Sequence, residues 1–147
     1  MNLNINKNEP VMVTGATGFV ASELIKKLLE NGITVHAAVR NPEDVSTLQH
    51  LTNLESTLSG EIIFFKSDLL EEESYLKSME GCSIVFHTAS PFNFKVKDNQ
   101  KGYINPALEG TRNVLDSVNK TESVKRVVLT SSCAAIYGDA VDISNYP

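Results

Sequence analysis

Residues 11–21 combine an apolar run with two glycines, a pattern typical of a phosphate-binding turn. The segment reads V-M-V-T-G-A-T-G-F-V-A. Gly15 lets the chain turn tightly, Gly18 lets the backbone approach a phosphate without a Cβ in the way, and Ala21 is small enough for close helix–strand packing. A helix that begins here offers its first N–H groups and its positive dipole end to an anion. The segment therefore predicts a dinucleotide pyrophosphate site, with an ordinary glycine turn as the alternative.

A single cation, Arg40, follows the next apolar run and bears on the choice of dinucleotide. Proteins that prefer NAD usually carry Asp or Glu at this place to hold the ribose 2′-OH, whereas a guanidinium matches the 2′-phosphate of NADP. We therefore expect NADP as the cofactor. NAD stays the alternative, because no second basic residue follows before Lys66. A solvated surface arginine is the competing interpretation.

Polar or small residues follow two further apolar runs. The carboxylate of Asp68 can accept a hydrogen bond from an adenine amino group while Leu69 packs on the ring, although Asp68 could instead cap the next helix. Small residues that let the backbone run along a cofactor come later: Thr88, Ala89 and Ser90. His87, directly before them, is expected to be a packed histidine at the end of a strand.

Three hydroxyl residues end the last apolar run: Thr130, Ser131 and Ser132. Hydroxyl groups at such a place can cap the end of their own strand or can face a bound ligand. Ligands of parallel sheets gather at the carboxyl ends of the strands, which makes the second interpretation worth testing.

Apolar runs alternate with amphipathic segments along the whole chain. Strands are predicted over about residues 11–13, 33–39, 61–66, 84–86 and 127–129. Helices are predicted after residue 18 up to Asn31, from Asn41 to about 54–58, over about 71–79, and from Asn105. Continuous apolar strands are typical of parallel sheets covered on both sides. We therefore expect one α/β dinucleotide-binding domain over residues 1–147, a Rossmann-type doubly wound parallel sheet with helices on both faces and strand order 3-2-1-4-5.

Periodicity and capping residues give finer expectations. Asn41 is predicted to cap the second helix, with Pro42 at its first position. Residues 91–103 are predicted to form an irregular loop. The first helix is expected to bury one face: Val20, Leu24, Ile25, Leu28 and Leu29. The last helix is expected to bury another: Ala107, Leu108, Thr111, Val114, Leu115 and Val118.

Composition narrows the classes of partner. The 147 residues are 41% hydrophobic and 21% charged, with a formal net charge of −5 and no basic cluster, so neither nucleic acid nor a membrane surface is an expected partner. No apolar stretch has the length of a membrane span. Residues 1–9 are polar, unlike a signal peptide, and we expect a cytoplasmic protein with Cys82 and Cys133 reduced. A disulfide between them is the alternative, and neither cysteines nor histidines have metal-ligand spacing.

The strand ends together resemble the extended short-chain dehydrogenase/reductase superfamily, including the NAD-dependent epimerase/dehydratase family. The superfamily's cofactor loop runs T-G-x-x-G-F-[IV]-[GA], as residues 14–21 do. Within it, the chain looks most like the branch of dihydroflavonol 4-reductase and cinnamoyl-CoA reductase. The supporting segments are A-V-R-N-P (38–42), V-F-H-T-A-S-P (85–91) and N-P-A-L-E-G-T-R-N-V-L (105–115).

The resemblance implies roles for particular residues. Ser132 would hydrogen-bond the substrate oxygen, and Thr130 and Ser131 would line the nicotinamide side. The implied cofactor contacts are Gly15, Thr17, Gly18, Phe19, Val20, Arg40, Asp68, Leu69, Thr88, Ala89, Ser90, Thr130 and Ser131. The implied function is an NADP-dependent oxidoreductase that reduces a ketone or aldehyde of a small organic substrate.

The Tyr-x-x-x-Lys pair on which this superfamily's chemistry depends is absent from the sequence. In that pair the lysine lowers the pKa of the tyrosine, which protonates the carbonyl oxygen. Neither Tyr137 nor Tyr146 has a lysine four residues on. We therefore expect the cofactor-binding portion of a longer enzyme, inactive by itself and without its substrate lobe. A nucleotide-sugar epimerase or dehydratase and a non-catalytic dinucleotide-binding module stay open, as do the substrate and the oligomeric state.

Overall fold

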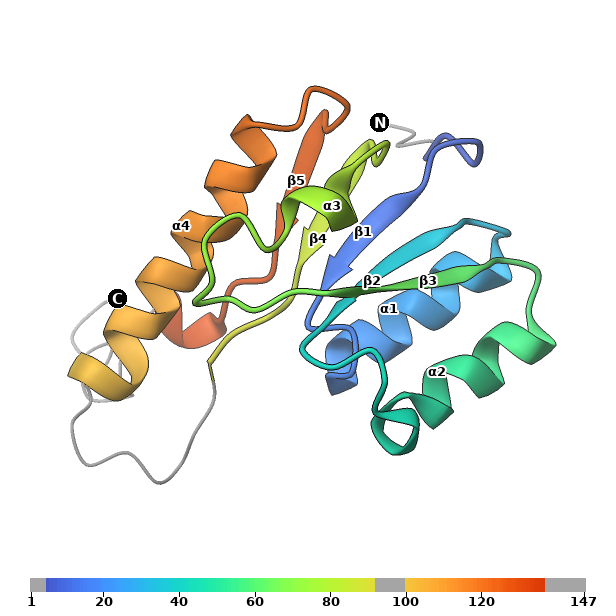
Figure 1. Cartoon of the computed structure of the whole chain (residues 1–147), viewed down its shortest axis with the longest axis horizontal. Coiled ribbons are helices and arrows are strands. Elements are labelled where there is room, and N and C mark those ends of the chain that lie inside the picture. Colours follow the sequence, from blue (N-terminus) through green and yellow to red (C-terminus); the bar gives the residue numbers. More distant parts are fainter. Residues whose placement is uncertain (1–4, 92–99, 137–147) are drawn as a thin grey trace, which may run out of the picture.

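The computed structural model describes residues 5–91 and 100–136. Strands and helices alternate along them (Figure 1). The strands are β1 (Val11–Thr14), β2 (Val35–Val39), β3 (Ile62–Lys66), β4 (Ile84–His87) and β5 (Arg126–Leu129). The helices are α1 (Phe19–Glu30), α2 (Val45–Thr57), α3 (Leu76–Met79) and α4 (Asn105–Asn119), with a π-helical turn at Gln100–Ile104 and a 3-10 turn at Cys133–Ala135.

The five strands form one parallel sheet in the order β3-β2-β1-β4-β5, which confirms the predicted fold class and strand order. The register aligns the carboxyl ends of the strands. Thr14 lies beside Ala38 on one side and His87 on the other, and His87 lies beside Leu129. Residues that follow the strands therefore emerge along one edge of the sheet.

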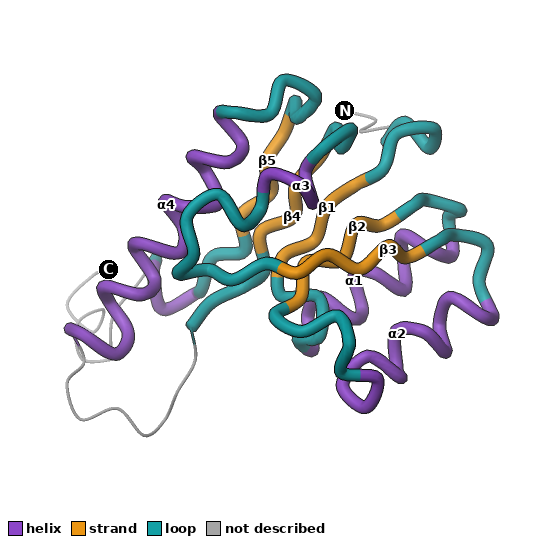
Figure 2. Tube along the Cα trace, viewed as in Figure 1, coloured by secondary structure: helices purple, strands orange, loops and turns teal. Residues whose placement is uncertain are grey.

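Helices cover both faces of the sheet (Figure 2), as expected. The alternation of side chains along β1 shows why, because Val11 and Val13 pack in the core beneath α1 and α2, whereas Met12 packs in a second core against α3 and α4. Ile25 of α1 and Leu51 of α2 pack in this first core. Ala21 is only 1% exposed, so this small residue packs α1 closely against the sheet.

Three predicted boundaries are wrong. The cap of α2 is Asp44, whose carboxylate accepts the Thr47 N–H at 3.2 Å. The predicted cap, Asn41, instead forms a turn in which its side-chain oxygen accepts the Glu43 N–H at 3.1 Å. The short helix predicted over 71–79 begins only at Leu76, because Glu73 has a φ of +61°, which interrupts a right-handed helix. Within the loop predicted over 91–103, residues 92–99 lie outside the described residues, Pro91 has no regular secondary structure, and the π-helical turn covers residues 100–103.

Two predicted helix faces are partly wrong. Val20 is 57% exposed at the start of α1 rather than buried. On α4 the buried residues are Gly110, Val114 and Ser117, whereas Leu108 and Leu115 are exposed. The Gly110 side of α4 faces the protein because a small residue permits close packing there. No helix among the described residues is both long and apolar enough to cross a membrane.

Candidate functional site

The glycine turn joins β1 to α1. Gly15 has a φ of +62°, and a Cβ built on it would lie 3.0 Å from the Cα and Cβ of Ala89. Gly15 is therefore required both by its left-handed backbone and by contact with the segment that follows β4. The Gly18 N–H donates to the Gly15 carbonyl at 2.9 Å, which closes the turn. The Ala16 N–H donates to the Ala38 carbonyl at 3.3 Å, which ties the turn to β2.

Gly18 caps α1 without a side chain, and the first turn of α1 carries no acidic residue. The first N–H groups of a helix have no partner within it and carry its positive dipole end. A cradle of glycine backbone in front of them fits the pyrophosphate of a dinucleotide. Thr17, Phe19 and Val20 are exposed at this helix end, with Phe19 exposed to 87%.

A contact with α2 supports the same helix end. The Ser22 hydroxyl donates to the Gly18 carbonyl at 2.8 Å, and His50 Nε2 lies 3.0 Å from the same hydroxyl. Since Ser22 has one proton to donate, His50 Nε2 acts as donor in this pair. Neither residue was singled out as a support of the turn from the sequence.

Thr14, the last residue of β1, holds the segment that follows β4. Its buried hydroxyl accepts the N–H groups of Thr88 and Ala89 at 3.1 and 2.9 Å and lies 2.9 Å from Nδ1 of His87. The Thr88 hydroxyl donates back to the Thr14 carbonyl. Burial lowers the pKa of His87. His87 is thus a packed strand-end residue, as predicted, and Ser90 lies exposed beyond this network.

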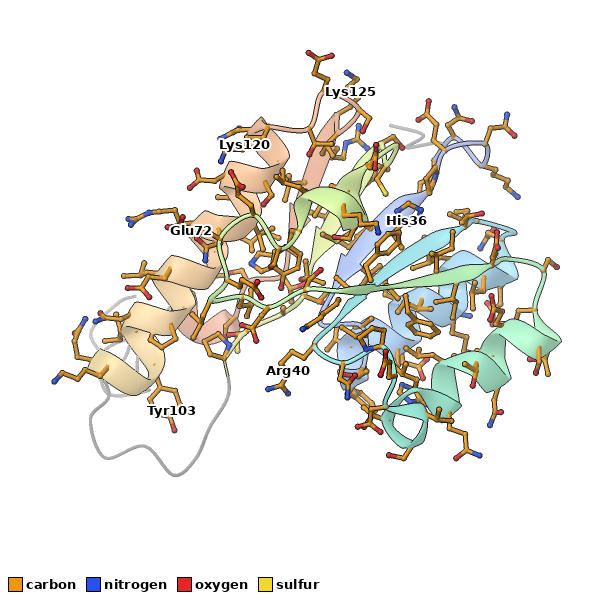
Figure 3. The ribbon with its side chains drawn as sticks, in the orientation of Figure 1. His36, Arg40, Glu72, Tyr103, Lys120 and Lys125 are labelled. Atoms are coloured by element: carbon orange, nitrogen blue, oxygen red, sulfur yellow. The ribbon has the colours of Figure 1, made fainter. Side chains whose placement is uncertain are left out.

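Arg40 lies at the end of β2, and its side chain extends away from the ribbon (Figure 3). It is exposed, so it can reach a phosphate at this edge of the sheet. The nearby Asp44 carboxylate accepts hydrogen bonds from Ser46 and Thr47, which hold its pKa below its usual range. The ionised carboxylate of Asp44, four residues after Arg40, would repel a phosphate bound at Arg40.

Asp68 follows β3 and does not cap the next helix, because α3 begins at Leu76. One of its carboxylate oxygens accepts the Leu70 N–H at 2.9 Å in an Asx turn. Burial, with the nearby Asp68 charge, raises the pKa of Tyr75. Leu69 is held from α4, since Asn113 donates to its carbonyl at 2.8 Å.

Thr130, Ser131 and Ser132 follow β5 and are exposed. The Thr130 N–H donates to the His87 carbonyl at 3.0 Å, so the ladder between β4 and β5 continues one residue past the strand. Ser132 stands at the start of the 3-10 turn, where its carbonyl accepts the Ala135 N–H at 3.0 Å. These residues occupy the same edge of the sheet as the glycine turn, at the far side of β4.

The remaining one of the chain's three histidines, His36, lies away from this edge. His36, in β2, is buried beside Phe65 and has Nδ1 at 2.9 Å from the Ser78 carbonyl and 3.3 Å from Sγ of Cys82 (Figure 3). Burial raises the pKa of Cys82 to about 12, so this thiol stays protonated. Both cysteines are free, and no cluster of three metal-binding side chains occurs among the described residues.

Four residues that support the segments of the candidate site were not functional candidates in the sequence analysis: Thr14, Ser22, Gly110 and Asn113. Thr14 and the pair on α4 lie in segments that the resemblance had quoted, N-P-A-L-E-G-T-R-N-V-L among them. The sequence carried one signal for Gly110, which is a glycine in the middle of a predicted helix. Such a residue costs about 1 kcal/mol relative to alanine, so its presence indicates a packing or functional reason.

A doubly wound parallel sheet with a glycine turn between its first strand and first helix defines a Rossmann-type fold. The chain belongs to the NAD dependent epimerase/dehydratase family, whose profile matches residues 11–146.

Individual relatives agree with this assignment. Cinnamoyl-CoA reductase CAD2 of Medicago truncatula is 50% identical over 131 residues, which cover 89% of this chain and 40% of the relative. Anthocyanidin reductase of Arabidopsis thaliana is 47% identical over 124 residues, with 84% and 36% covered. The structure of yeast methylglyoxal/isovaleraldehyde reductase Gre2 complexed with NADPH superposes with a TM-score of 0.72 at 30% identity, covering 86% of this chain and 38% of that one. The chain thus spans about two fifths of the length of these relatives.

Proposed function

We propose that the chain is the dinucleotide-binding portion of an NADP-dependent oxidoreductase that reduces a ketone or aldehyde of a small organic substrate. The observation that carries the proposal is the glycine turn, in which Gly15 has a left-handed backbone and Gly18 caps an α1 helix whose first turn has no acidic residue. The reductase names of the relatives and the NADPH in the Gre2 structure support it.

Each strand end has a part in this proposal. The first N–H groups of α1 bind the pyrophosphate, Arg40 binds the 2′-phosphate, and Asp68 accepts the adenine amino group. Ser132 donates a hydrogen bond to the substrate oxygen, where negative charge develops during reduction. When bound, NADPH supplies a hydride to the carbonyl carbon.

The proposal also covers the other contacts, the substrate and the compartment. The remaining cofactor contacts are assigned to the exposed end of α1 and to the segments after β3, β4 and β5: Thr17, Gly18, Phe19, Val20, Leu69, Thr88, Ala89, Ser90, Thr130 and Ser131. A small-molecule carbonyl compound is the partner. The proposal places the protein in the cytoplasm, which the free thiols of Cys82 and Cys133 support.

Titration of NADPH fluorescence against two matched glycine variants tests the site. Gly15 and Gly32 have φ values of +62° and +73°, so alanine is strained at both, but a Cβ at Gly32 meets nothing within 4 Å. We expect Gly15→Ala to weaken NADPH binding by about tenfold or more, because the turn and its contact with Ala89 both shift. Gly32→Ala should leave the affinity unchanged. A folded Gly15→Ala protein with unaltered affinity would refute the site.

The reaction class needs a separate assay on the longer enzyme. A reductase consumes free NADPH when a simple ketone or aldehyde is added, whereas a nucleotide-sugar epimerase or dehydratase uses its cofactor without net consumption. NADPH binding without any consumption would favour the latter class or a non-catalytic module.

A further inference from the structure

Two residues of helix α4 contact Leu69 in the segment that follows β3. Asn113 Nδ2 donates to the Leu69 carbonyl at 2.8 Å. One turn earlier on the same face, a Cβ built on Gly110 would lie 3.1–3.4 Å from three side-chain atoms of Leu69. A mid-helix glycine is unfavourable unless something demands it, and here the demand is the close approach of Leu69.

The segment itself is rigid around Asp68. The Asp68 N–H donates to the Ser74 hydroxyl at 3.1 Å, and that hydroxyl donates to the Asp68 carbonyl at 2.7 Å. With the Asx turn to Leu70, these bonds fix the Asp68 carboxylate relative to the peptide of Leu69. A contact that positions Leu69 therefore also positions the Asp68 carboxylate.

The chain path explains why an outside support is needed. After β3, at one edge of the sheet, the segment crosses to α4 before it turns into α3 (Figure 1). Residues Glu72 and Glu73 of this crossing segment and Asn113 of α4 line a common groove of about 390 Å³. The second link across the groove, an ion pair of 2.8 Å between Lys120 and Glu73, is exposed at both side chains and so contributes little.

We propose that Asn113 and Gly110 are positioning residues that hold Leu69, and through it the Asp68 carboxylate, for recognition of the adenine amino group. The proposal rests on the proposed dinucleotide function. Asn113 supplies the donor that orients the Leu69 peptide, and Gly110 supplies the space that lets the leucine side chain sit against α4.

The test compares NADPH with its deamino analogue, in which hypoxanthine replaces adenine and the amino group is lost. The wild-type chain should bind NADPH about threefold to tenfold more tightly than the analogue, as expected for one hydrogen bond. Asn113→Ala and Asn113→Asp should each bring this ratio close to one, and so should Asp68→Asn. Gly110→Ala should reduce the ratio as well, because its Cβ displaces Leu69.

The matched control is Asn119→Ala, which removes an exposed asparagine from the end of the same helix and should keep the wild-type ratio. Urea unfolding checks that each variant is folded. The affinity ratio separates a positioning role from a purely structural one, since a merely structural loss lowers both affinities equally and leaves their ratio unchanged. An unchanged ratio in folded Asn113→Ala or Gly110→Ala protein overturns the proposal, and so does a wild-type ratio of one. Failure of the wild-type chain to bind either dinucleotide would instead refute the proposed function.

Discussion

The hydroxyl of Thr14 shows how one residue can set the protonation of another. It accepts two backbone N–H groups, from Thr88 and Ala89, and these use both of its lone pairs. Its single proton is then donated to Nδ1 of His87. The neutral His87 ring therefore carries its proton on Nε2, and a protonated ring would disrupt the network that holds residues 88 and 89 against Gly15.

Stability should consequently depend on the titration of His87. Burial lowers the pKa of His87 in the folded protein, so below a pH of about 6.5 the unfolded chain takes up a proton that the folded chain resists. The free energy of unfolding should fall as the pH falls below this value, by at most about 1.4 kcal/mol per pH unit from this residue. His87→Asn keeps an acceptor for Thr14 and should lack this part of the slope in urea unfolding. Thr14→Ser should keep it, and an equal slope in His87→Asn would contradict the assignment.

Arg40 should decide the choice between the two dinucleotides. We expect the chain to bind NADPH roughly tenfold to a hundredfold more tightly than NADH, through a charge-assisted contact with the 2′-phosphate. Arg40→Ala should remove most of this difference, measured by fluorescence titration of both cofactors. Arg126→Ala, an exposed arginine at the amino end of β5, is the control and should leave the ratio unchanged. Equal affinities of the wild-type chain for NADPH and NADH would refute this role of Arg40. The test is demanding because the ionised Asp44 in the same segment would repel the 2′-phosphate.

At the level of elements, helix ends were predicted less well than helix existence. Asn41 and Asp44 both carry capping side chains, and only the structure shows that Asn41 forms a turn while Asp44 caps α2.

The connection from α2 to β3 contains a glycine, Gly60, at which the structure leaves no room for a side chain. A Cβ there would lie 2.5 Å from the Ile33 carbonyl oxygen and 2.8 Å from the Cα of Leu29.

Gly60→Ala should therefore destabilise the packing of α1 against the start of β3. Backbone atoms surround the new methyl group and must shift, which should lower the free energy of unfolding by about 1–3 kcal/mol. NADPH affinity should stay unchanged, because this connection precedes β3 and lies at the sheet edge opposite the glycine turn. Ser59→Ala, an exposed neighbour, serves as control in urea unfolding. Wild-type stability in Gly60→Ala would show that the connection can relax.

For the whole molecule, the centre of the sheet and its two edge strands, β3 and β5, differ in burial. Strands β1 and β2 are buried throughout, whereas Val128 and Leu129 of β5 are 42% and 54% exposed. The hydroxyl residues Thr130, Ser131 and Ser132 follow the exposed edge strand β5. The proposed substrate side of the site therefore lies at an exposed edge of the sheet, whereas the glycine turn follows a buried central strand.

We expect the 147-residue chain by itself to reduce carbonyl compounds no faster than background, because its sequence carries no Tyr-x-x-x-Lys pair to protonate the oxygen. In the longer enzyme, Ser132→Ala should lower kcat by about a hundredfold to a thousandfold while NADPH affinity changes little. Steady-state kinetics and cofactor titration on the same preparations measure both. Ser131→Ala is the comparison, and normal turnover in Ser132→Ala would transfer the role to Ser131.

Local patterns in the sequence determined the alternation of strands and helices, the parallel sheet and the glycine turn. These follow from periodicity and from backbone freedom within a few neighbouring residues. The tertiary structure decided which segments meet: Thr14 bonds His87 across 73 residues, and Asn113 bonds Leu69 across 44. It also decided that α4 buries Gly110 rather than Leu108. Periodicity places residues on a face, but the neighbour that covers the face depends on how the crossovers bring distant segments together, and no local pattern carries that information.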